Sequence, residues 1–208
     1  MIIRPCVDDK VFPFLMIDNF YNEEELELIW EDLTNIGTLG SLLVKAKGHE
    51  GVATDEDGTP KADLRRCGLD ELYEGNREKS NIFKVYEKIT SSKVVDAYKE
   101  TTAAYRTFTS TNNDTTIINY YDHGDYYKEH NDVFIHSCLI FFYIQPKKFT
   151  GGDLVFTDSG ATVECLHNRM ILFTSYYLHK VTEIEMNEED RNKGLGRYSF
   201  AHFYTYNN

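Results

Sequence analysis

The sequence between Asn119 and Asp132 reads Asn-Tyr-Tyr-Asp-His-Gly-Asp-Tyr-Tyr-Lys-Glu-His-Asn-Asp. It ends in His130-x-Asp132, and on an extended backbone these two side chains point to the same side, because strand side chains alternate with a period of two. A second histidine from another strand would complete a face of two imidazoles and one carboxylate, the usual holder of non-haem Fe(II). His-x-Asp alone recurs by chance, so the rest of the chain has to supply the missing parts.

Length and composition favour a soluble globular domain. The chain has 208 residues, of which 41% are apolar and 27% charged, and this size suits one domain with a sizeable core. The chain has no run of about 18 apolar residues, so we expect no membrane-spanning helix. The N-terminus lacks the apolar core of a signal peptide. The four cysteines show no Cys-x-x-Cys spacing, so we expect free thiols in a reducing cytoplasm, which also suits ferrous iron; they are Cys6, Cys67, Cys138 and Cys165.

The net charge bears on possible partners. Twenty-two Lys and Arg residues stand against 34 Asp and Glu residues, which gives a net charge of -12. Proteins that bind a phosphate backbone neutralise it with Lys and Arg. We therefore expect no nucleic-acid partner, although a small local basic patch could form in the fold. Because the chain has no long apolar run, we also expect no membrane partner.

The first part of the chain predicts a strand, a helix and a loop. Phe12–Phe20 is a short apolar strand, and Asn22 is a plausible N-cap for a helix that runs to about Leu33. Gly37 and Gly40 would end this helix. The glycine- and acid-rich segment from Lys45 to Pro60 predicts a mobile loop. Further helices follow, with apolar stripes at Ile82, Val85, Tyr86 and Ile89 and at Val94, Val95, Tyr98, Ala104 and Tyr105.

After residue 112 the pattern changes to short β segments separated by turns. Eight strands at roughly even spacing predict an all-β sandwich or barrel. The helices before them would cover one face of a sheet. The predicted strands are Thr116–Tyr121, Tyr127–Asp132, Ile135–Gln145, Gly152–Thr157, Ala161–Leu166, Met170–Ser175, Leu178–Ile184 and Tyr198–Tyr206.

Two late segments can complete the site that His130-x-Asp132 begins. His179 follows a buried-looking strand and opens the next one, so it is the candidate second histidine. Arg197 and Ser199 share one face of the last strand, and an arginine beside a hydroxyl can bind a carboxylate. A single histidine is more often a surface or core residue with a satisfied hydrogen bond, and we assign that role to His49, His167 and His202.

Taken together, these residues resemble the Fe(II)/2-oxoglutarate-dependent dioxygenases, specifically the prolyl 4-hydroxylase-like branch. The resemblance begins at Phe14–Phe20 and then runs from Tyr121 to Tyr204. The spacing Tyr-x-x-Gly-x-x-Tyr-x-x-His-x-Asp that starts at Tyr121 is that of the branch. So are the segments Phe149–Phe156 and Asn168–Phe173 ahead of the distal histidine.

The resemblance implies a fold and a set of roles. The fold would be a double-stranded β-helix (jelly-roll) core over residues 113–208, with N-terminal helices and a lid loop in residues 1–112, in one domain spanning 1–208. Fe(II) would be bound by His130, Asp132 and His179. The far carboxylate of 2-oxoglutarate would be bound by Arg197, Ser199, Tyr143 and Tyr121, whereas Tyr120 points to the opposite face. Tyr127 and Phe203 fall where prolyl hydroxylases place aromatic walls around the target ring.

Two departures bear on the substrate. Many relatives carry an arginine seven residues before the Tyr143 position, and here that residue is His136. Only Val133-Phe134-Ile135 links His-x-Asp to the next strand. Arg65 or Arg66, on the candidate lid between Lys45 and Glu78, would replace the missing cation, or both are solvated charges.

The leading functional interpretation is an Fe(II)- and 2-oxoglutarate-dependent dioxygenase that uses O2, with ascorbate as support, to hydroxylate a prolyl residue in a peptide or protein. Succinate and CO2 would be its co-products. The same chemistry on a free amino acid, another side chain or a small metabolite is the main alternative. A nucleic-acid demethylase ranks third because of the net charge. A catalytically silent β-sandwich binding module is the alternative from a different class.

Overall fold

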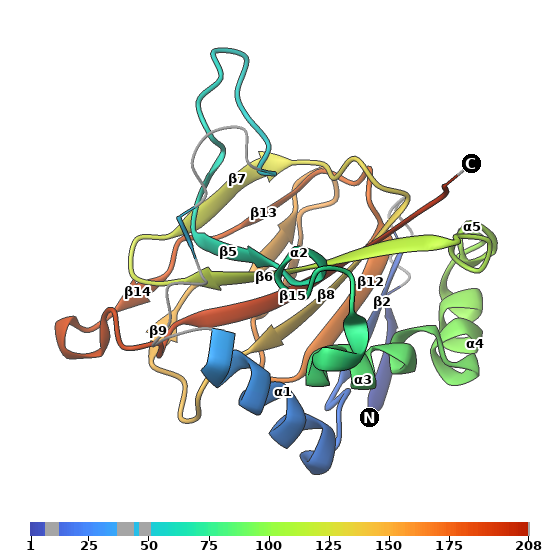
Figure 1. Cartoon of the computed structure of the whole chain (residues 1–208). Helices are drawn as coiled ribbons and strands as arrows, with labels where there is room; N and C mark the ends of the chain where they lie inside the picture. Colours follow the sequence, from blue (N-terminus) through green and yellow to red (C-terminus); the bar gives the residue numbers. More distant parts are fainter. Residues whose placement is uncertain (7–12, 37–43, 46–50, 208) are drawn as a thin grey trace.

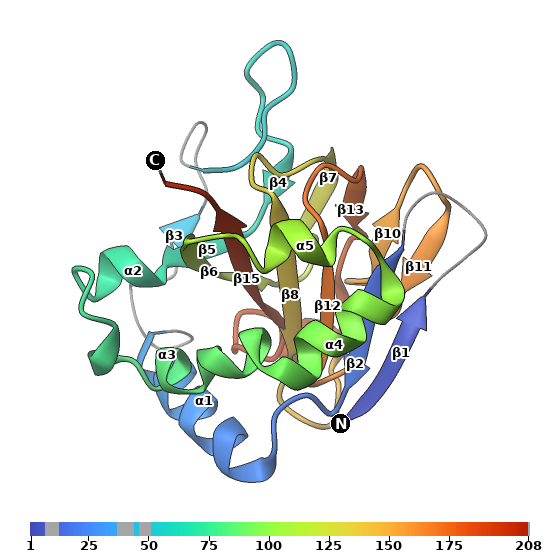
Figure 2. The same ribbon diagram turned by 90° about the vertical axis from the view of Figure 1, so that its right-hand side faces the viewer.

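The computed structural model describes residues 1–6, 13–36, 44–45 and 51–207, and it is mainly β with flanking helices. Gly37, Gly40 and His49 lie outside these residues. Two antiparallel sheets face each other as a double-stranded β-helix, and the helices lie outside the larger sheet (Figures 1 and 2). The predicted fold class is confirmed.

The larger sheet is eight-stranded within the described residues and contains the strands with the most continuous burial. Its central strands, β12 (Arg169–Thr174), β8 (His136–Phe142) and β15 (Arg197–Thr205), bury almost every side chain, because both of their faces are covered. In spatial order the strands are β1 (Ile2–Cys6), β2 (Phe14–Asp18), β12 (Arg169–Thr174), β8 (His136–Phe142), β15 (Arg197–Thr205), β6 (Asn113–Tyr121), β5 (Arg65–Gly68) and β3 (Val44–Lys45).

The smaller sheet carries the His-x-Asp strand. Along the described chain it contains five strands, in the order β11 (Ala161–Val163), β10 (Leu154–Phe156), β13 (His179–Val181), β7 (Tyr126–His130) and β4 (Ala62–Asp63). A further short pair, which the sequence did not predict, joins β9 (Phe149–Thr150) to β14 (Glu185–Met186). All eight predicted strands are present, most of them shorter than expected.

The two faces of the larger sheet have separate partners. Alternate residues of β8 belong to different apolar clusters: Cys138, Ile140 and Phe142 pack with the helices, whereas Leu139 and Phe141 face the smaller sheet. The same alternation holds along β15, where Phe200 packs outward and Ala201 inward. Each strand therefore contributes one set of side chains to packing and the other set to the space between the sheets.

The helices cover the outer face of the larger sheet (Figure 2). The first begins with the predicted N-cap: the Asn22 side chain accepts from the Glu25 N–H at 2.9 Å, and the Glu25 carboxylate accepts from the Asn22 N–H at 2.7 Å. It continues one turn past the predicted end at Leu33. The helices are α1 (Glu23–Ile36), α2 (Leu69–Leu72), α3 (Asn81–Tyr86), α4 (Ser92–Thr101) and α5 (Tyr105–Phe108). None of the helices in the described ranges is long and apolar enough to cross a membrane.

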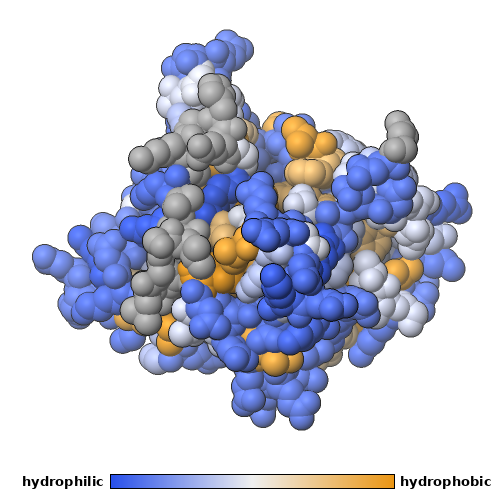
Figure 3. All heavy atoms as spheres, viewed as in Figure 1, coloured by the Kyte–Doolittle hydropathy of each residue, from blue (hydrophilic) through white to orange (hydrophobic). Residues whose placement is uncertain are grey.

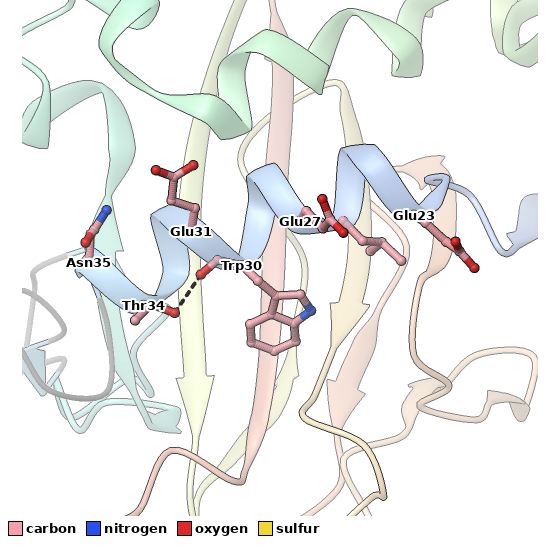
Figure 4. A pocket seen from close by; sticks show the side chains of 7 residues that line it. Glu23, Glu27, Trp30, Glu31, Thr34 and Asn35 are labelled. Atoms are coloured by element: carbon pink, nitrogen blue, oxygen red, sulfur yellow. Dashed lines mark hydrogen bonds between the residues drawn. The ribbon is translucent and has the colours of Figure 1, made fainter.

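A groove on the outer surface follows α1 (Figure 4). Leu26 and Trp30 form its apolar part, and Glu23, Glu27 and Glu31 lie along the same helix. The Trp30 ring packs edge-on against Tyr198, a residue of the outward-facing set of β15. The larger sheet therefore separates this groove from the space between the two sheets.

The segment predicted as a loop and lid is partly built into both sheets. Ala62–Asp63 pairs with β7, and Arg65–Gly68 then pairs with β6, so the chain crosses from one sheet to the other. Before this crossing, residues 51–61 project from the molecule and close on themselves through a bridge between Thr54 and Pro60 (Figure 1). The Ala53 N–H donates to the Tyr127 hydroxyl at 2.9 Å, which anchors the projection to β7.

Candidate active site

Two histidines and an aspartate meet where β7 ends and β13 begins. His130 and His179 are direct register partners across the two antiparallel strands, and Asp132 lies just past the end of β7. One ligand atom from each residue lies within 4.8 Å of the others. Each Nε2 is 3.7 Å from an oxygen of the Asp132 carboxylate. The structure thus brings together the three residues that the sequence predicted as metal ligands.

Backbone carbonyls fix both imidazole rings. Nδ1 of His130 is 2.8 Å from the Lys128 carbonyl oxygen, and Nδ1 of His179 is 2.8 Å from that of Tyr177. A carbonyl oxygen only accepts, so each Nδ1 carries the proton. Each Nε2 lone pair is then left to face the common point beside Asp132, which is the arrangement that metal-binding histidines require.

Two serines orient the carboxylate. The Ser137 hydroxyl donates to Oδ2 of Asp132 at 2.5 Å and lies 2.8 Å from the Ser175 hydroxyl. The Asp132 N–H donates to the Ser175 carbonyl at 2.9 Å. Sequence reasoning missed both serines. Strand alternation could have found Ser137, because it shares the inward face of β8 with Phe141 and Tyr143.

The electrostatics of this cluster suit a cation. Burial, and the neighbouring His179, lower the pKa of His130 to about 3, so its imidazole is neutral at physiological pH. Burial also raises the pKa of the Asp132 carboxyl, because ionising it there without a positive partner is unfavourable. A divalent metal would supply that partner while accepting both Nε2 lone pairs, so the donor set fits one.

Arg197 provides a second uncompensated charge between the sheets. Its side chain is fully buried, and none of its three guanidinium nitrogens has a hydrogen-bond partner in the described part of the chain. The guanidinium carbon lies 4.8 Å from the centre of the Tyr121 ring and 4.4 Å from that of Phe141. A buried cation without an anion is costly. Its surroundings therefore fit a ligand carboxylate.

Small residues leave room beside Arg197. A Cβ added to Gly152 would lie 2.9 Å from Cδ of Arg197, so glycine permits this close approach. Along β15 the inward-facing residues after Arg197 are Ser199 and Ala201, both short and buried. The next inward residue, Phe203, is the register partner of Ser137, which holds Asp132. The buried cation and the His-Asp-His cluster therefore lie along one face of the larger sheet.

The other predicted pocket residues form two groups. Tyr121 and Tyr143 belong to the interior that contains Arg197, and Tyr127 and Phe203 lie nearer the His-Asp-His cluster. Tyr121 lies against Arg197, as the sequence predicted for a carboxylate-binding residue. Tyr143 faces the same interior, where its ring packs against Phe149 and His167. Tyr127 stacks directly on the His130 imidazole, with ring centroids 3.6 Å apart, and Phe203 stacks on Phe134 at 4.5 Å.

The structure corrects the proposed contact between His136 and substrate. His136 lies on the outer face of β8, where the Tyr98 hydroxyl and the Thr107 hydroxyl are 3.2 and 2.8 Å from its two ring nitrogens. Phe108 packs against the same ring. The larger sheet therefore lies between this imidazole and the His-Asp-His cluster.

The two candidate arginines of β5 take different positions. Arg65 lies over the Tyr120 ring at 5.9 Å, on the outer side of the sheet, so it does not reach the site. Arg66 is on the inner side, because its register partner on β6 is Asn119, which is also the partner of the inward-facing Ser199. Burial lowers the pKa of its guanidinium, and Tyr127, Tyr121, Glu71 and Asp132 act in the opposite direction. Its guanidinium also donates to the Gly51 carbonyl. Of the two, Arg66 is the one that faces the cluster.

Comparison with known proteins agrees with this geometry. Residues 116–205 match the sequence model of the 2OG-Fe(II) oxygenase superfamily. The fold is similar to that of a prolyl-4-hydroxylase from Pseudomonas putida, at 14% identity and a TM-score of 0.60, over 94% of this chain and 93% of that one. No curated protein matches the sequence.

Two further solved structures are similar. One is an oxidoreductase of the 2OG-Fe(II) oxygenase family from Burkholderia pseudomallei, with 16% identity and a TM-score of 0.57 over 94% of this chain and 86% of that one. The other is a viral collagen prolyl hydroxylase from Paramecium Bursaria Chlorella virus-1, with 11% identity and a TM-score of 0.53 over 92% and 94%. Residues 116–205 thus carry the sequence pattern of the 2OG-Fe(II) oxygenase superfamily. The overall fold is similar to that of two prolyl hydroxylases.

Buried histidines predict how stability depends on pH. Burial lowers the pKa of His130 and His202 to about 3 and that of His136 to about 4. Below about pH 6.5 these histidines bind protons in the unfolded chain but stay neutral in the folded chain. The free energy of unfolding therefore falls as the pH falls. Each histidine should contribute a slope of about 1.4 kcal/mol per pH unit between roughly pH 6 and 4.

Urea unfolding of the metal-free protein across this range measures the slope. His202→Asn keeps a polar atom near Thr116, which contacts Nδ1 of His202 at 2.8 Å, and removes the titrating group. This variant should lose one histidine's share of the slope. An unchanged slope would contradict the prediction.

Proposed function

We propose that the protein is an Fe(II)- and 2-oxoglutarate-dependent dioxygenase that hydroxylates a prolyl residue in a peptide or protein, with succinate and CO2 as co-products. The superfamily match implies Fe(II), 2-oxoglutarate and O2. Two of the similar structures are described as prolyl hydroxylases, which supports a prolyl target. The observation that carries the proposal is the pairing of the His-Asp-His cluster with a buried Arg197 whose guanidinium has no hydrogen-bond partner in the described part of the chain.

Each group has a place in this proposal. Fe(II) would be held by Nε2 of His130, Nε2 of His179 and the Asp132 carboxylate. The far carboxylate of 2-oxoglutarate would pair with Arg197, with Ser199, Tyr121 and Tyr143 at the same end of the pocket. When bound, Fe(II) with 2-oxoglutarate and O2 supplies the oxidising chemistry that hydroxylates a C–H bond.

The chain itself orients the metal ligands and excludes water from the site. The carbonyls of Lys128 and Tyr177 hold the protons on Nδ1, so the opposite nitrogens stay available as ligands. The hydroxyl of Ser137 fixes the direction of the Asp132 carboxylate. The rings of Tyr121 and Phe141 exclude water from Arg197, and this strengthens its attraction for an anion.

One observation favours the main alternative, in which the same chemistry acts on a free amino acid, another side chain or a small metabolite. His136 occupies the position of an arginine in many prolyl 4-hydroxylase-like relatives, and it faces the helices rather than the site. Its substrate contact is therefore absent here. Arg66 is the described cation on the inner side that could take part instead.

One assay separates these possibilities. The purified protein with Fe(II), ascorbate and 2-oxoglutarate should release succinate, slowly without substrate and faster with it. Mass spectrometry of a proline-containing peptide library should detect peptides heavier by one oxygen atom. Oxidation of a free amino acid but of no peptide would favour the alternative, and no succinate at all would remove the enzyme proposal in favour of a silent binding module.

Ser137→Ala should weaken metal binding. Without the hydroxyl, the Asp132 carboxylate loses the hydrogen bond that fixes its orientation, and partners of this kind are typically worth about 10- to 100-fold in metal affinity. Anaerobic Fe(II) titration would measure the change. Ser110→Ala, a substitution at an exposed site, serves as control, and equal affinities for the two variants would count against the proposed role of Ser137.

Arg197→Ala should raise the KM for 2-oxoglutarate by about 100-fold or more, because removing one partner of a buried ion pair typically costs about 3–5 kcal/mol. Arg197→Lys keeps the charge without the planar pair of donors, so its KM should be intermediate. Succinate release at varied 2-oxoglutarate is the measurement, with Arg106→Ala as an exposed control. A KM unchanged in both Arg197 variants would remove Arg197 from this role.

A further inference from the structure

Two exposed apolar side chains stand on the segments next to the candidate site. Val133 is 94% exposed and Tyr176 is 63% exposed, which makes them the two most exposed large hydrophobic side chains among the residues that the structure describes. Val133 directly follows Asp132. Tyr176 directly follows Ser175, in the short segment that leads to His179. Isolated exposed hydrophobic residues are normal on any surface, so the shared position of these two is the informative feature.

Hydrogen bonds hold the two segments against each other. The Asp132 N–H donates to the Ser175 carbonyl at 2.9 Å, and the Ser175 N–H donates to the Ile135 carbonyl at 3.1 Å. Ser175 thus binds both ends of the turn that contains Val133 and Phe134. Tyr176, as the next residue, must lie beside this turn. We call Val133, Phe134 and Tyr176 the apolar rim.

The apolar rim continues into the wall of the site. Phe134 stacks on Phe203 with ring centroids 4.5 Å apart, and Phe203 is the register partner of Ser137 next to Asp132. Tyr176 packs edge-on against Tyr177, which is buried and whose carbonyl holds His179. In Figure 3 an apolar patch lies at the upper edge of the molecule, near the end of β7, above a largely hydrophilic face.

We propose that the apolar rim binds a residue that flanks the target in an extended peptide or protein segment, and that this flanking residue is apolar. The inference rests on the proposed function. An extended chain whose target residue sits in the site has the rim beside it, because Val133 and Tyr176 adjoin the segments that carry Asp132 and His179. A free amino acid would lie wholly inside the site. The Val133 and Tyr176 side chains would then stay in water and contribute no free energy of binding.

The test uses two matched peptide pools and free L-proline as probes. Both pools have the form Gly-Gly-X-Pro-Y-Gly-Gly, with X and Y taken from Val, Leu, Phe and Tyr in the apolar pool and from Ser, Asn and Gly in the polar pool. Hydroxylated product is measured by mass spectrometry, and succinate release is followed in the same samples. The apolar pool should be turned over with a kcat/KM about tenfold higher than the polar pool, since a well-fitted apolar contact is typically worth about 10- to 200-fold.

Variants connect this preference to the rim. Val133→Ser and Tyr176→Ser should each raise the KM for the apolar pool by about fivefold to tenfold and reduce its advantage over the polar pool. A merely structural effect would instead raise the KM for 2-oxoglutarate and lower the Tm, so both are measured. Ile2→Ser is the matched control, because Ile2 is 49% exposed on the edge strand β1, away from the site.

The outcomes separate the inference from the proposed function. Equal turnover of the two pools, a preference that survives both rim substitutions, or free proline used as well as the apolar pool would overturn the inference and leave the dioxygenase intact. Succinate release without hydroxylation of any probe would overturn both the inference and the prolyl target. Absence of succinate release under every condition would overturn the proposed function itself.

Discussion

The site depends on one interaction, the antiparallel pairing of β7 with β13. These strands are far apart in sequence, and their register sets His130 directly opposite His179. The register shifts immediately afterwards, between His179 and Val181, so the alignment is local to the two imidazoles. A one-residue slip would turn one ring to the other side of the sheet and separate the pair. Asp132 then needs only to follow the end of β7 for the cluster to form.

Strand alternation keeps chemistry and packing apart. On β15, Arg197, Ser199, Ala201 and Phe203 face the site, whereas Tyr198, Phe200, His202 and Tyr204 pack under the helices. The outward set supplies apolar burial, and this lets the inward set contain small and polar residues that would be poor choices for a core. The helices thus support the site from the far side of a single sheet, without contacting it.

The sequence predicted the parts that obey local rules. His130-x-Asp132, a later histidine and an arginine at the start of the last strand could be placed because order and alternation are visible in one dimension. His136 failed by the same rule: it lies seven residues before Tyr143, an odd separation, so the two residues occupy opposite faces of β8. The choice between Arg65 and Arg66 could not be made, because which face of β5 turns inward depends on its pairing with β6. Alternation places Ser137 on the inward face of β8, but its contacts with Asp132 and Ser175 also depend on the register of β8 against β12.

The fold contains opposite charges that it does not pair with each other. Asp132 is held by the Ser137 hydroxyl beside two imidazoles, and Arg197 is buried between aromatic rings with no acceptor among the described residues. Leaving such groups uncompensated opposes folding, so the remaining burial in both sheets has to offset that cost. The arrangement is reasonable only if each charge has its own external partner. A cation satisfies the first and an anion the second, and one ligand that binds the cation at one end and presents a carboxylate at the other would satisfy both at once. Separating the two charges along the inner face of the larger sheet therefore selects for a ligand of defined length and polarity, and 2-oxoglutarate has both properties.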